Sequence, residues 1–418
     1  MAEVQTDITG TARATRVIAR CRELALCTET PGETTRMFLC EAMRECHSHV
    51  RGWMEAAGMS VSVDHAGNIR GVWAAEEAEA PRLLIASHLD TVPNAGAFDG
   101  VLGVMMGIAL VEELGGQRLP FAIEVIGFSE EEGTRFGVPF LGSRALVGGL
   151  DDALLARTDE HGCSVGEAIT TFGLNTSRIA EAALTEKPLG YFEIHIEQGP
   201  VLEAEEQPLG VVESIAGQTR MEFAFYGEAN HAGTTPMYLR KDALLAAAEW
   251  MLAVEAYARG VQGLVATTGR VTAEPGAVNV VAGEARVTLD VRHATDAIRN
   301  EAVDAVTVTA QKVAGERGVR AVWEKKSEQA AVPMDGRLTT MLEMGVMAAG
   351  IPVRLMVSGA GHDAMMVATR MPAAMLFLRS PGGLSHHPEE SVLPGDVEKA
   401  LAAGVEFLNV LAESQGGK

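Results

Sequence analysis

Four short apolar runs in this chain lead into, or enclose, histidine and acidic side chains. Three of them are LLIA (83–86) before SHLD, AIEVIGF (122–128) before SEEEG, and AMLFL (374–378) shortly before GGLSHHP; the fourth is YFEIHIEQG (191–199), with a histidine inside it. Short continuous apolar runs are typical of buried strands. In an open α/β sheet, ligands bind beyond the carboxyl ends of the strands. The sequence therefore predicts one ligand site where several strand ends meet.

The polar side chains at these strand ends form a candidate set of metal ligands. The set consists of His88, Asp99, the run Glu130–Glu132, His195 and His386. Imidazole and carboxylate are the groups with which hydrolases hold borderline divalent metals. Each residue alone has an ordinary alternative, such as a turn aspartate or a core histidine, but together at one sheet edge they predict a two-metal hydrolase. Asp99 can bridge two ions, and Asp90 can accept a hydrogen bond from the second ring nitrogen of His88.

The composition narrows the class of protein. A chain of 418 residues is too long for one core, which predicts two domains. Its net charge of −22 argues against nucleic-acid binding, because phosphate recognition needs a basic face. No apolar run resembles a signal peptide or a membrane span, and the five cysteines show no CxxC spacing. We therefore expect reduced, mostly buried thiols without a zinc site, in a cytoplasmic protein.

Strand and helix patterns alternate in the first half of the chain. Helical periodicity over residues 12–58 is followed by strand-like segments at 61–73 and 83–87, and residues 101–114 have the composition of a buried helix. This order is typical of an α/β domain. We expect a mainly parallel sheet with helices on both faces.

The pattern changes near residue 213. A half-buried strand pattern at 219–227 precedes helical patterns at 241–258 and 296–318 and strand patterns at 264–271 and 285–292. Two helices over an antiparallel sheet make a small α+β module, here expected to be ferredoxin-like. Because the first pattern returns after about residue 330, we expect a catalytic domain in two parts, 1–213 and 330–418, interrupted by an inserted domain at 214–329.

Eight motifs carry a resemblance to a known family. They are SHLDTV (87–92), NAGAFDG (94–100), SEEEGTRF (129–136), LGSRALVG (141–148), HIEQGPVLE (195–203), NHAGTTPM (230–237), SGAGHDA (358–364) and GLSHHPEE (383–390). In this order and spacing they resemble the amidase/hydantoinase–carbamoylase family of dinuclear-metal amidohydrolases, relatives of the aminoacylase and carboxypeptidase peptidases. The resemblance covers about residues 15–412; Ala95 departs from a common glycine. Within the family, IAGQTR (215–220), NHAGTTPM and SGAGHDA are together most similar to allantoate amidohydrolase.

The resemblance implies a role for each candidate ligand. Asp99 becomes the bridge between two divalent ions per subunit. His88 and His195 then bind the first ion, and Glu132 and His386 bind the second. The resemblance favours Mn²⁺, while the His and carboxylate donors also suit Zn²⁺ or Co²⁺.

The same resemblance distinguishes the three consecutive glutamates, which spacing alone leaves open. It makes Glu131 the general base, Glu132 the ligand and Glu130 a neighbour. The implied reaction is hydrolysis of the ureido C–N bond in a small carboxylate, most similar to allantoate cleavage with release of ammonia and CO2. N-carbamoyl-L-amino acids, N-carbamoyl-β-alanine and ureidoglycolate stay open as substrates. A related aminoacylase or peptidase activity, or a binding protein with a vestigial site, remains as an alternative class.

Substrate contacts are also implied by resemblance. Arg292, in DVRH, and Asn279, in VNVV, hold the substrate carboxylate, and Arg292 suits a bidentate grip. Gln198, Gly361 and His362 line the pocket. Without the resemblance, Arg292 is an ordinary surface residue of a strand.

The last expectation is a homodimer formed through the inserted domain, which also serves as a lid. His231, in NHAGTTPM, resembles the family residue that reaches the neighbouring subunit's site and stabilises charge on the attacked carbonyl. The helix at 241–258 carries apolar side chains that could meet a partner, namely Leu244, Leu245, Trp250 and Leu252. Covering the module's own sheet is the alternative role for these residues.

Overall fold

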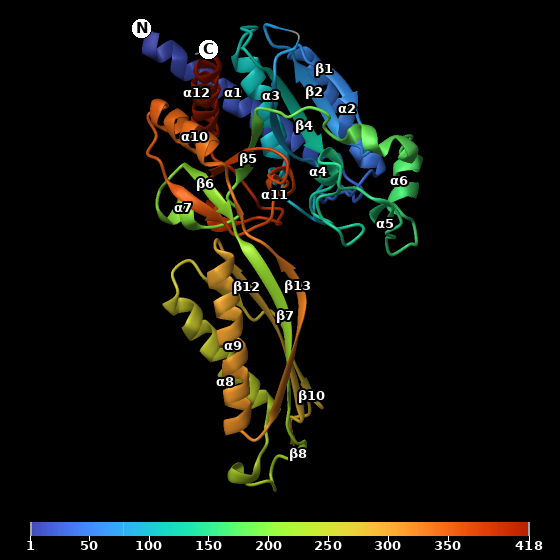
Figure 1. Ribbon diagram of the computed structural model, residues 1–418, viewed down its shortest axis with the longest axis vertical. Helices are drawn as coiled ribbons and strands as arrows, with labels where there is room; N and C mark the ends of the chain where they lie inside the picture. The colour runs from blue at the N-terminus through green and yellow to red at the C-terminus, as the bar shows by residue number, and fades with distance from the viewer. Residues whose placement is uncertain (1, 78, 417–418) are drawn as a thin grey trace. The chain divides into compact units, whose positions relative to one another are not determined.

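The computed structural model describes residues 2–77 and 79–416, which form two compact units (Figure 1). Unit 1 contains the chain up to Glu213, Met334–Met356 and the chain from Gly361 on. Unit 2 contains Ser214–Pro333 and Val357–Ala360. Most of unit 2 is thus one continuous segment between two parts of unit 1. In the described part of the chain, no helix is long and apolar enough to cross a membrane.

The larger sheet has nine strands, in the order β1-β2-β4-β3-β5-β16-β6-β14, with β15 also paired to β6. Their bounds are β1 Ser60–Val63, β2 Ile69–Trp73, β3 Arg82–His88, β4 Ala122–Phe128, β5 Gly190–Ile196, β6 Leu209–Ile215, β14 Val332–Pro333, β15 Leu355–Ser358 and β16 Ala373–Leu378. The central strands β4, β3, β5 and β16 are parallel. The pairs β1–β2, β2–β4, β16–β6 and β6–β14 are antiparallel. The sheet is therefore mixed, not mainly parallel, because strands such as β1 and β2 enter it as a tight hairpin, which only antiparallel strands can form.

Unit 1 also contains helices, several of which pack against this sheet. The longer ones are α1 Ala2–Ala25, α2 Glu41–Ala56, α3 Val101–Glu113, α10 Gly336–Ala348 and α12 Pro394–Gly416. The shorter ones are α4 Leu141–Leu146, α5 Asp152–Leu155, α6 Val165–Thr171, α7 Val201–Ala204, α11 Ala364–Val367 and the 3₁₀ turns η1 Thr176–Ala182 and η3 Pro381–Gly383. Helix α3 is buried from Val101 to Val111 because it is apolar on every face, and it packs on β3, β4 and β5.

The expected helical region 12–58 is two helices separated by a loop. Arg36, fully buried in that loop, donates through Nη1 to the carbonyl oxygens of Leu24 (2.6 Å) and Cys27 (2.9 Å). Carbonyl groups in the last turn of a helix lack partners within the helix. The Arg36 guanidinium thus binds the carbonyl of Leu24 in the last turn of α1, a contact that hydrophobic periodicity does not reveal.

Unit 2 is an antiparallel sheet with two helices on one face (Figure 1). The strands are β7 Gly217–Tyr226, β9 Val265–Thr267, β10 Val271–Glu274, β12 Glu284–His293 and β13 Arg320–Gln329, and the helices are α8 Ala243–Gly260 and α9 Asp296–Glu316. A separate two-stranded antiparallel sheet pairs β8 (Asn230–His231) with β11 (Val280–Val281), and η2 spans Met237–Leu239. The sequence did not predict β13, because half of its residues are charged and most of them are exposed.

Candidate active site

The ligand candidates converge at the carboxyl ends of the four parallel strands. His88 ends β3 opposite Phe128 of β4, and His195 pairs with Phe377 of β16 near the end of β5. Glu131 and Glu132 follow β4 directly, and His386 follows β16. Neighbouring parallel strands end at the same edge, so four segments far apart in the chain deliver their side chains to one place.

Asp99 lies between two groups of ligand atoms. Its Oδ1 is 3.5 Å from Nε2 of His88 and 3.2 Å from Nε2 of His195, and those two nitrogens are 3.5 Å apart. Tetrahedral ligands at about 2.1 Å from one ion lie about 3.4 Å from one another. Oδ1 is also buried and has no hydrogen-bond partner among the described residues. These three atoms therefore fit a divalent ion.

The second oxygen of Asp99 faces the other group. Its Oδ2 is 3.2 Å from Nε2 of His386, and that nitrogen is 3.3 Å from Oε1 of Glu132. Glu131 and Glu132 also come within 4.8 Å of His88 through one ligand atom each. The Glu130 carboxylate is fully buried and belongs to none of the ligand groups found among the described residues.

Backbone carbonyls orient two of the imidazole rings. Nδ1 of His88 lies 3.0 Å from the carbonyl oxygen of Asp90, and Nδ1 of His195 lies 2.9 Å from that of Ile196. An imidazole nitrogen facing a carbonyl oxygen must carry the proton. In its neutral form each ring therefore has an unprotonated Nε2 facing Asp99, which is the form in which imidazole binds a metal.

Asp90 acts differently from the expectation. Its carboxylate accepts the backbone N–H groups of Glu131 (2.9 Å) and Glu132 (3.1 Å), whereas Oδ1 is 3.5 Å from Nδ1 of His88. The closer contact of His88 is the backbone carbonyl of Asp90. The Asp90 side chain thus mainly holds the segment that carries the two glutamates.

The loop that carries Asp99 is held by residues that the sequence did not single out. Oε1 of buried Glu390 accepts the N–H groups of Phe98 (2.7 Å) and Asp99 (2.9 Å). Gly100 has φ +66°, and a Cβ there would lie 2.4 Å from the His88 ring, so no other residue fits. Glu390 is the last residue of GLSHHPEE, but nothing local separates it from its exposed neighbour Glu389.

Burial and charge shift the protonation of the site. Burial raises the pKa of the Glu131 carboxyl well above its usual value. Hydrogen bonds that the protonated His386 ring donates to Asp99 and Glu132 raise its pKa to about 10. Burial lowers the pKa of His362, whose ring packs edge-on against His195 at 4.5 Å between ring centroids, so it stays neutral. The carboxylates thus attract positive charge, and a metal cation can supply it.

The other pocket candidates of unit 1 lie against this centre. Nε2 of Gln198 donates to Oδ2 of Asp99 at 2.9 Å, and Ser385, which was not predicted, donates to the same oxygen at 2.8 Å. Gln198 and His386 have positive φ angles of 59° and 55°, a conformation that non-glycine residues rarely adopt. Strain of this kind is typical of functional sites. Gly361 directly precedes His362.

In unit 2, Arg292 is held in a fixed orientation. Its Nε and Nη2 each donate to the Asp290 carboxylate at 2.9 Å, and Nη1 donates to the carbonyl oxygen of Gly359 at 2.7 Å. A guanidinium has five N–H donors, so two remain for a ligand. Arg292 lines a hollow of about 760 Å³ together with Arg220 and Lys326.

Asn279 does not lie beside Arg292. It lies next to His231, because Ala232 donates its N–H to the Asn279 carbonyl (2.9 Å) and Val280 pairs with His231. Strand β12 begins at Glu284, five residues after Asn279. Arg292 lies eight residues further along this strand, more than about 25 Å from Glu284. One chain alone therefore cannot use both side chains on one carboxylate, contrary to the expectation for a single pocket.

His231 is exposed, with its tautomer set by the backbone. Its Nδ1 accepts the N–H groups of Gly233 (3.1 Å) and Thr234 (3.2 Å). A nitrogen that accepts hydrogen bonds carries no proton, so the neutral ring must carry its proton on Nε2. His231 thus presents an N–H donor to its surroundings.

Comparison with known proteins gives the family. The model of peptidase family M20/M25/M40 matches residues 84–414. This chain belongs to that family. It is 37% identical to "Probable allantoate deiminase" of Oryza sativa subsp. japonica, over 94% of this chain and 87% of the relative. It is 36% identical to N-carbamoyl-L-amino acid amidohydrolase of Geobacillus stearothermophilus, over 96% and 98%.

A solved structure agrees with this assignment. The crystal structure of an amidase of the hydantoinase/carbamoylase family from Burkholderia multivorans superposes with a TM-score of 0.89 at 30% identity, covering 94% of this chain and 97% of that one. The resemblance drawn from the motifs is therefore confirmed. The protein is a hydrolase of non-peptide C–N bonds, and its ligand groups fit divalent metal.

Proposed function

We propose that the protein hydrolyses the ureido C–N bond of allantoate and releases ammonia and CO2. The observation that carries the proposal is Asp99, whose two oxygens face separate ligand groups. The relatives named for allantoate and N-carbamoyl-L-amino acids share a substrate chemistry, a ureido group near a carboxylate. Allantoate is favoured because IAGQTR, NHAGTTPM and SGAGHDA are together most similar to the allantoate-cleaving members.

The proposed cofactor is two divalent ions per subunit, with Mn²⁺ favoured and Zn²⁺ or Co²⁺ also suited to these donors. His88 and His195 would hold one ion, Glu132 and His386 the other, and Asp99 both. Ions bound there supply Lewis-acid polarisation of a carbonyl and activation of water.

Glu131 is the proposed general base. It lies beside Glu132, and Asp90 holds the backbone of both residues. A carboxylate so placed can take a proton from water and pass it to the leaving nitrogen, which contributes typically about 10²–10⁴-fold.

The substrate carboxylate would bind to the two free N–H groups of Arg292, with Gln198, Gly361 and His362 lining the pocket. If Asn279 contacts the same substrate, it must come from a second subunit, because it lies at the opposite end of unit 2 from Arg292. His231 would arrive with it and donate its Nε2–H to the carbonyl oxygen under attack.

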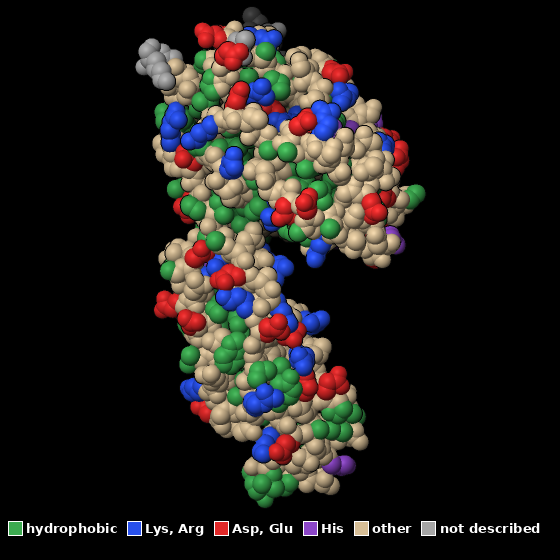
Figure 2. Space-filling view, turned by 45° about the vertical axis from the view of Figure 1, so that its right-hand side comes forward, with side chains coloured by type: hydrophobic (Ala, Val, Ile, Leu, Met, Phe, Trp, Pro, Cys, Tyr) green, Lys and Arg blue, Asp and Glu red, His purple; other side chains and the backbone are tan. Residues whose placement is uncertain are grey.

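If Arg292 and Asn279 come from different subunits, the protein forms a homodimer. Unit 2 would then be both its dimerisation domain and its lid. Figure 2 shows hydrophobic side chains on the surface of unit 2. On α8, Leu244, Leu245 and Leu252 are exposed, the last by 69%. Trp250 is different, because it is fully buried against Phe223 in the core of the unit. The exposed leucines are therefore the surface offered to a partner.

A second candidate is an N-carbamoyl-L-amino-acid hydrolase, since the relative of that name aligns over nearly both full chains. N-carbamoyl-β-alanine and ureidoglycolate belong to the same chemical class. All five cysteines are free, which suits the reducing cytoplasm as the place of action.

Ammonia release from these four ureido compounds tests the proposal. The protein is stripped of metal, reloaded with Mn²⁺, Zn²⁺ or Co²⁺, and assayed at equal substrate concentrations. We expect the highest kcat/KM with allantoate and Mn²⁺. A higher value with N-carbamoyl-L-amino acids would select the second candidate. Release of free amine from N-acetyl-amino acids without ammonia from any ureido compound would contradict both.

A further inference from the structure

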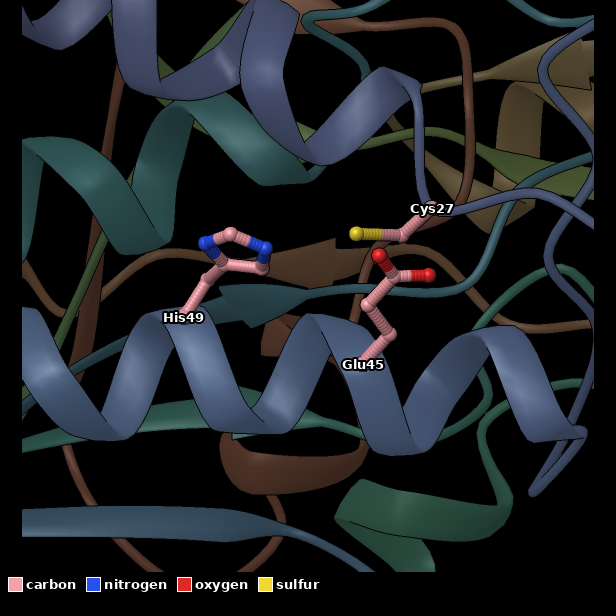
Figure 3. Close-up of side chains that lie close together, drawn as sticks. All are labelled: Cys27, Glu45 and His49. Carbon is pink, nitrogen blue, oxygen red and sulfur yellow. The ribbon is translucent and has the colours of Figure 1, made fainter.

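A second group of metal-ligating side chains lies away from the active site, between α1 and α2. Cys27 follows the end of α1, and Glu45 and His49 lie one turn apart on α2. One ligand atom from each residue lies within 4.8 Å of the other two. Figure 3 shows the three side chains pointing toward one another. None of the eight family motifs contains them.

His49 is oriented by a fourth residue. Its Nδ1 lies 3.0 Å from Oε1 of Glu23 on α1, which leaves Nε2 for the group formed with Cys27 and Glu45. Metal-binding histidines almost always direct their other ring nitrogen to a carboxylate or carbonyl in this way. This contact is independent of the clustering and points to the same use of His49.

We propose that Cys27, Glu45 and His49 bind a zinc ion, with Glu23 orienting His49. Thiolate, imidazole and carboxylate are the donors that zinc takes from proteins, and three protein ligands leave one position for water. The inference does not depend on the proposed function, because this site contains a thiolate and the active-site groups consist of His, Asp and Glu.

The surroundings of Cys27 favour this role over simple packing. Cys21, Cys40 and Cys46 are also buried thiols, but among the described residues only Cys27 belongs to a ligand group. Arg36 fixes the backbone of Cys27 by donating to its carbonyl oxygen at 2.9 Å. Glu45 is exposed and His49 half-buried, so an ion can enter from that side.

Zinc binding would displace the Cys27 proton and connect α1 to α2. Burial raises the pKa of the Cys27 thiol to about 12, so without an ion the thiol stays protonated. A metal that binds as the thiol loses its proton stabilises the folded arrangement that presents the ligands. The ion would close the loop between Cys27 and Glu45, and we expect added Zn²⁺ to raise the Tm of the full chain.

Cobalt substitution tests the site directly. The full-length protein is stripped of metal and titrated with Co²⁺, and the near-ultraviolet sulfur-to-cobalt charge-transfer band is recorded. The active-site ligand groups contain no thiolate, so the band reports Cys27. We expect one cobalt-thiolate site per chain, loss of the band in Cys27→Ser, and affinity weakened by about 10- to 100-fold in Glu23→Gln. Cys163→Ser, a thiol outside the group, is the matched control and keeps the band.

Two outcomes would overturn the site: no charge-transfer band in the wild type at saturating Co²⁺, or a band that persists in Cys27→Ser. If Cys27→Ser does not fold, the surface variants Glu45→Gln and His49→Gln decide, and unchanged cobalt affinity in both contradicts the proposal. Elemental analysis after Zn²⁺ loading should find one zinc ion fewer per chain in His49→Gln. Ammonia release by that variant with Mn²⁺ should equal the wild type, which keeps this test separate from the proposed function.

Discussion

Glu390 accepts the backbone N–H of Asp99 at 2.9 Å across 291 residues of sequence. The same oxygen accepts the N–H of Phe98. A buried carboxylate thus holds the loop that carries Asp99, and the Asp99 side chain lies between the two ligand groups. Because Glu390 acts on the backbone and belongs to none of the ligand groups found among the described residues, it is a positioning residue.

Glu390→Ala should weaken metal retention by about 10- to 100-fold, as loss of a residue that orients a ligand does. Glu390→Gln keeps an acceptor oxygen and should lose much less. Glu389→Gln, at the exposed neighbouring position, is the control. Metal affinity is measured by competition with a chelator of known affinity. Wild-type affinity in Glu390→Ala would show that the loop holds its shape without this contact.

Glu131→Gln should retain two ions per subunit yet lose kcat by at least about a hundredfold, because a general base is removed while the ligands stay. Glu132→Gln should instead lose metal. Elemental analysis and steady-state kinetics are carried out on the same samples. The reverse pattern would shift the two assignments by one residue.

Arg292→Lys should raise KM for carboxylate substrates far more than it lowers kcat, because a point charge replaces a planar fork that binds ground and transition states alike. Asp290→Asn should act in the same direction but less, since one of its two acceptor atoms remains. Arg286→Lys, an exposed arginine on the same strand, is the control. An unchanged KM in Arg292→Lys would remove this residue from the pocket.

Mixing Glu131→Gln subunits with His231→Ala subunits should restore activity. In a mixed dimer with shared sites, both defects fall in one site and the other site is intact, so up to about half of that dimer's activity returns. Subunit exchange is verified with differently tagged chains, and each variant alone serves as the control. Exchange without recovery would mean that His231 serves its own chain or none.

The candidate ligands could be located from the sequence because their signal is local. An apolar run followed by His88, or by Glu131 and Glu132, indicates both a buried strand and the polar residues at its end. Helix α3 was predictable for the same reason, since eleven consecutive buried positions are apolar. Strand β13 was missed because its charged residues indicate exposure to solvent and give no sign that the segment pairs in a sheet.

The partners of these residues depend on packing. Asp90 was expected to orient His88, but its carboxylate meets the backbone of Glu131 and Glu132, whose position depends on how β3 lies beside β4. Arg292 and Asn279 were expected to share a carboxylate, but Arg292 lies near the end of β12 while Asn279 precedes its start and lies beside His231. The buried position of Trp250, between a helix and a sheet, likewise needed the packed unit.

The sequence by itself determined the chemistry of this protein: which side chains can bind metal, which strands they end or follow, and which family they resemble. Chemistry and periodicity are properties of neighbouring residues, so they can be recognised before folding is known. Only the tertiary structure decided that Glu390 holds Asp99, that Cys27 meets His49, and that Asn279 lies beside His231. These pairs depend on which distant segments pack together, because a hydrogen bond forms only where folding brings donor and acceptor within about 3 Å.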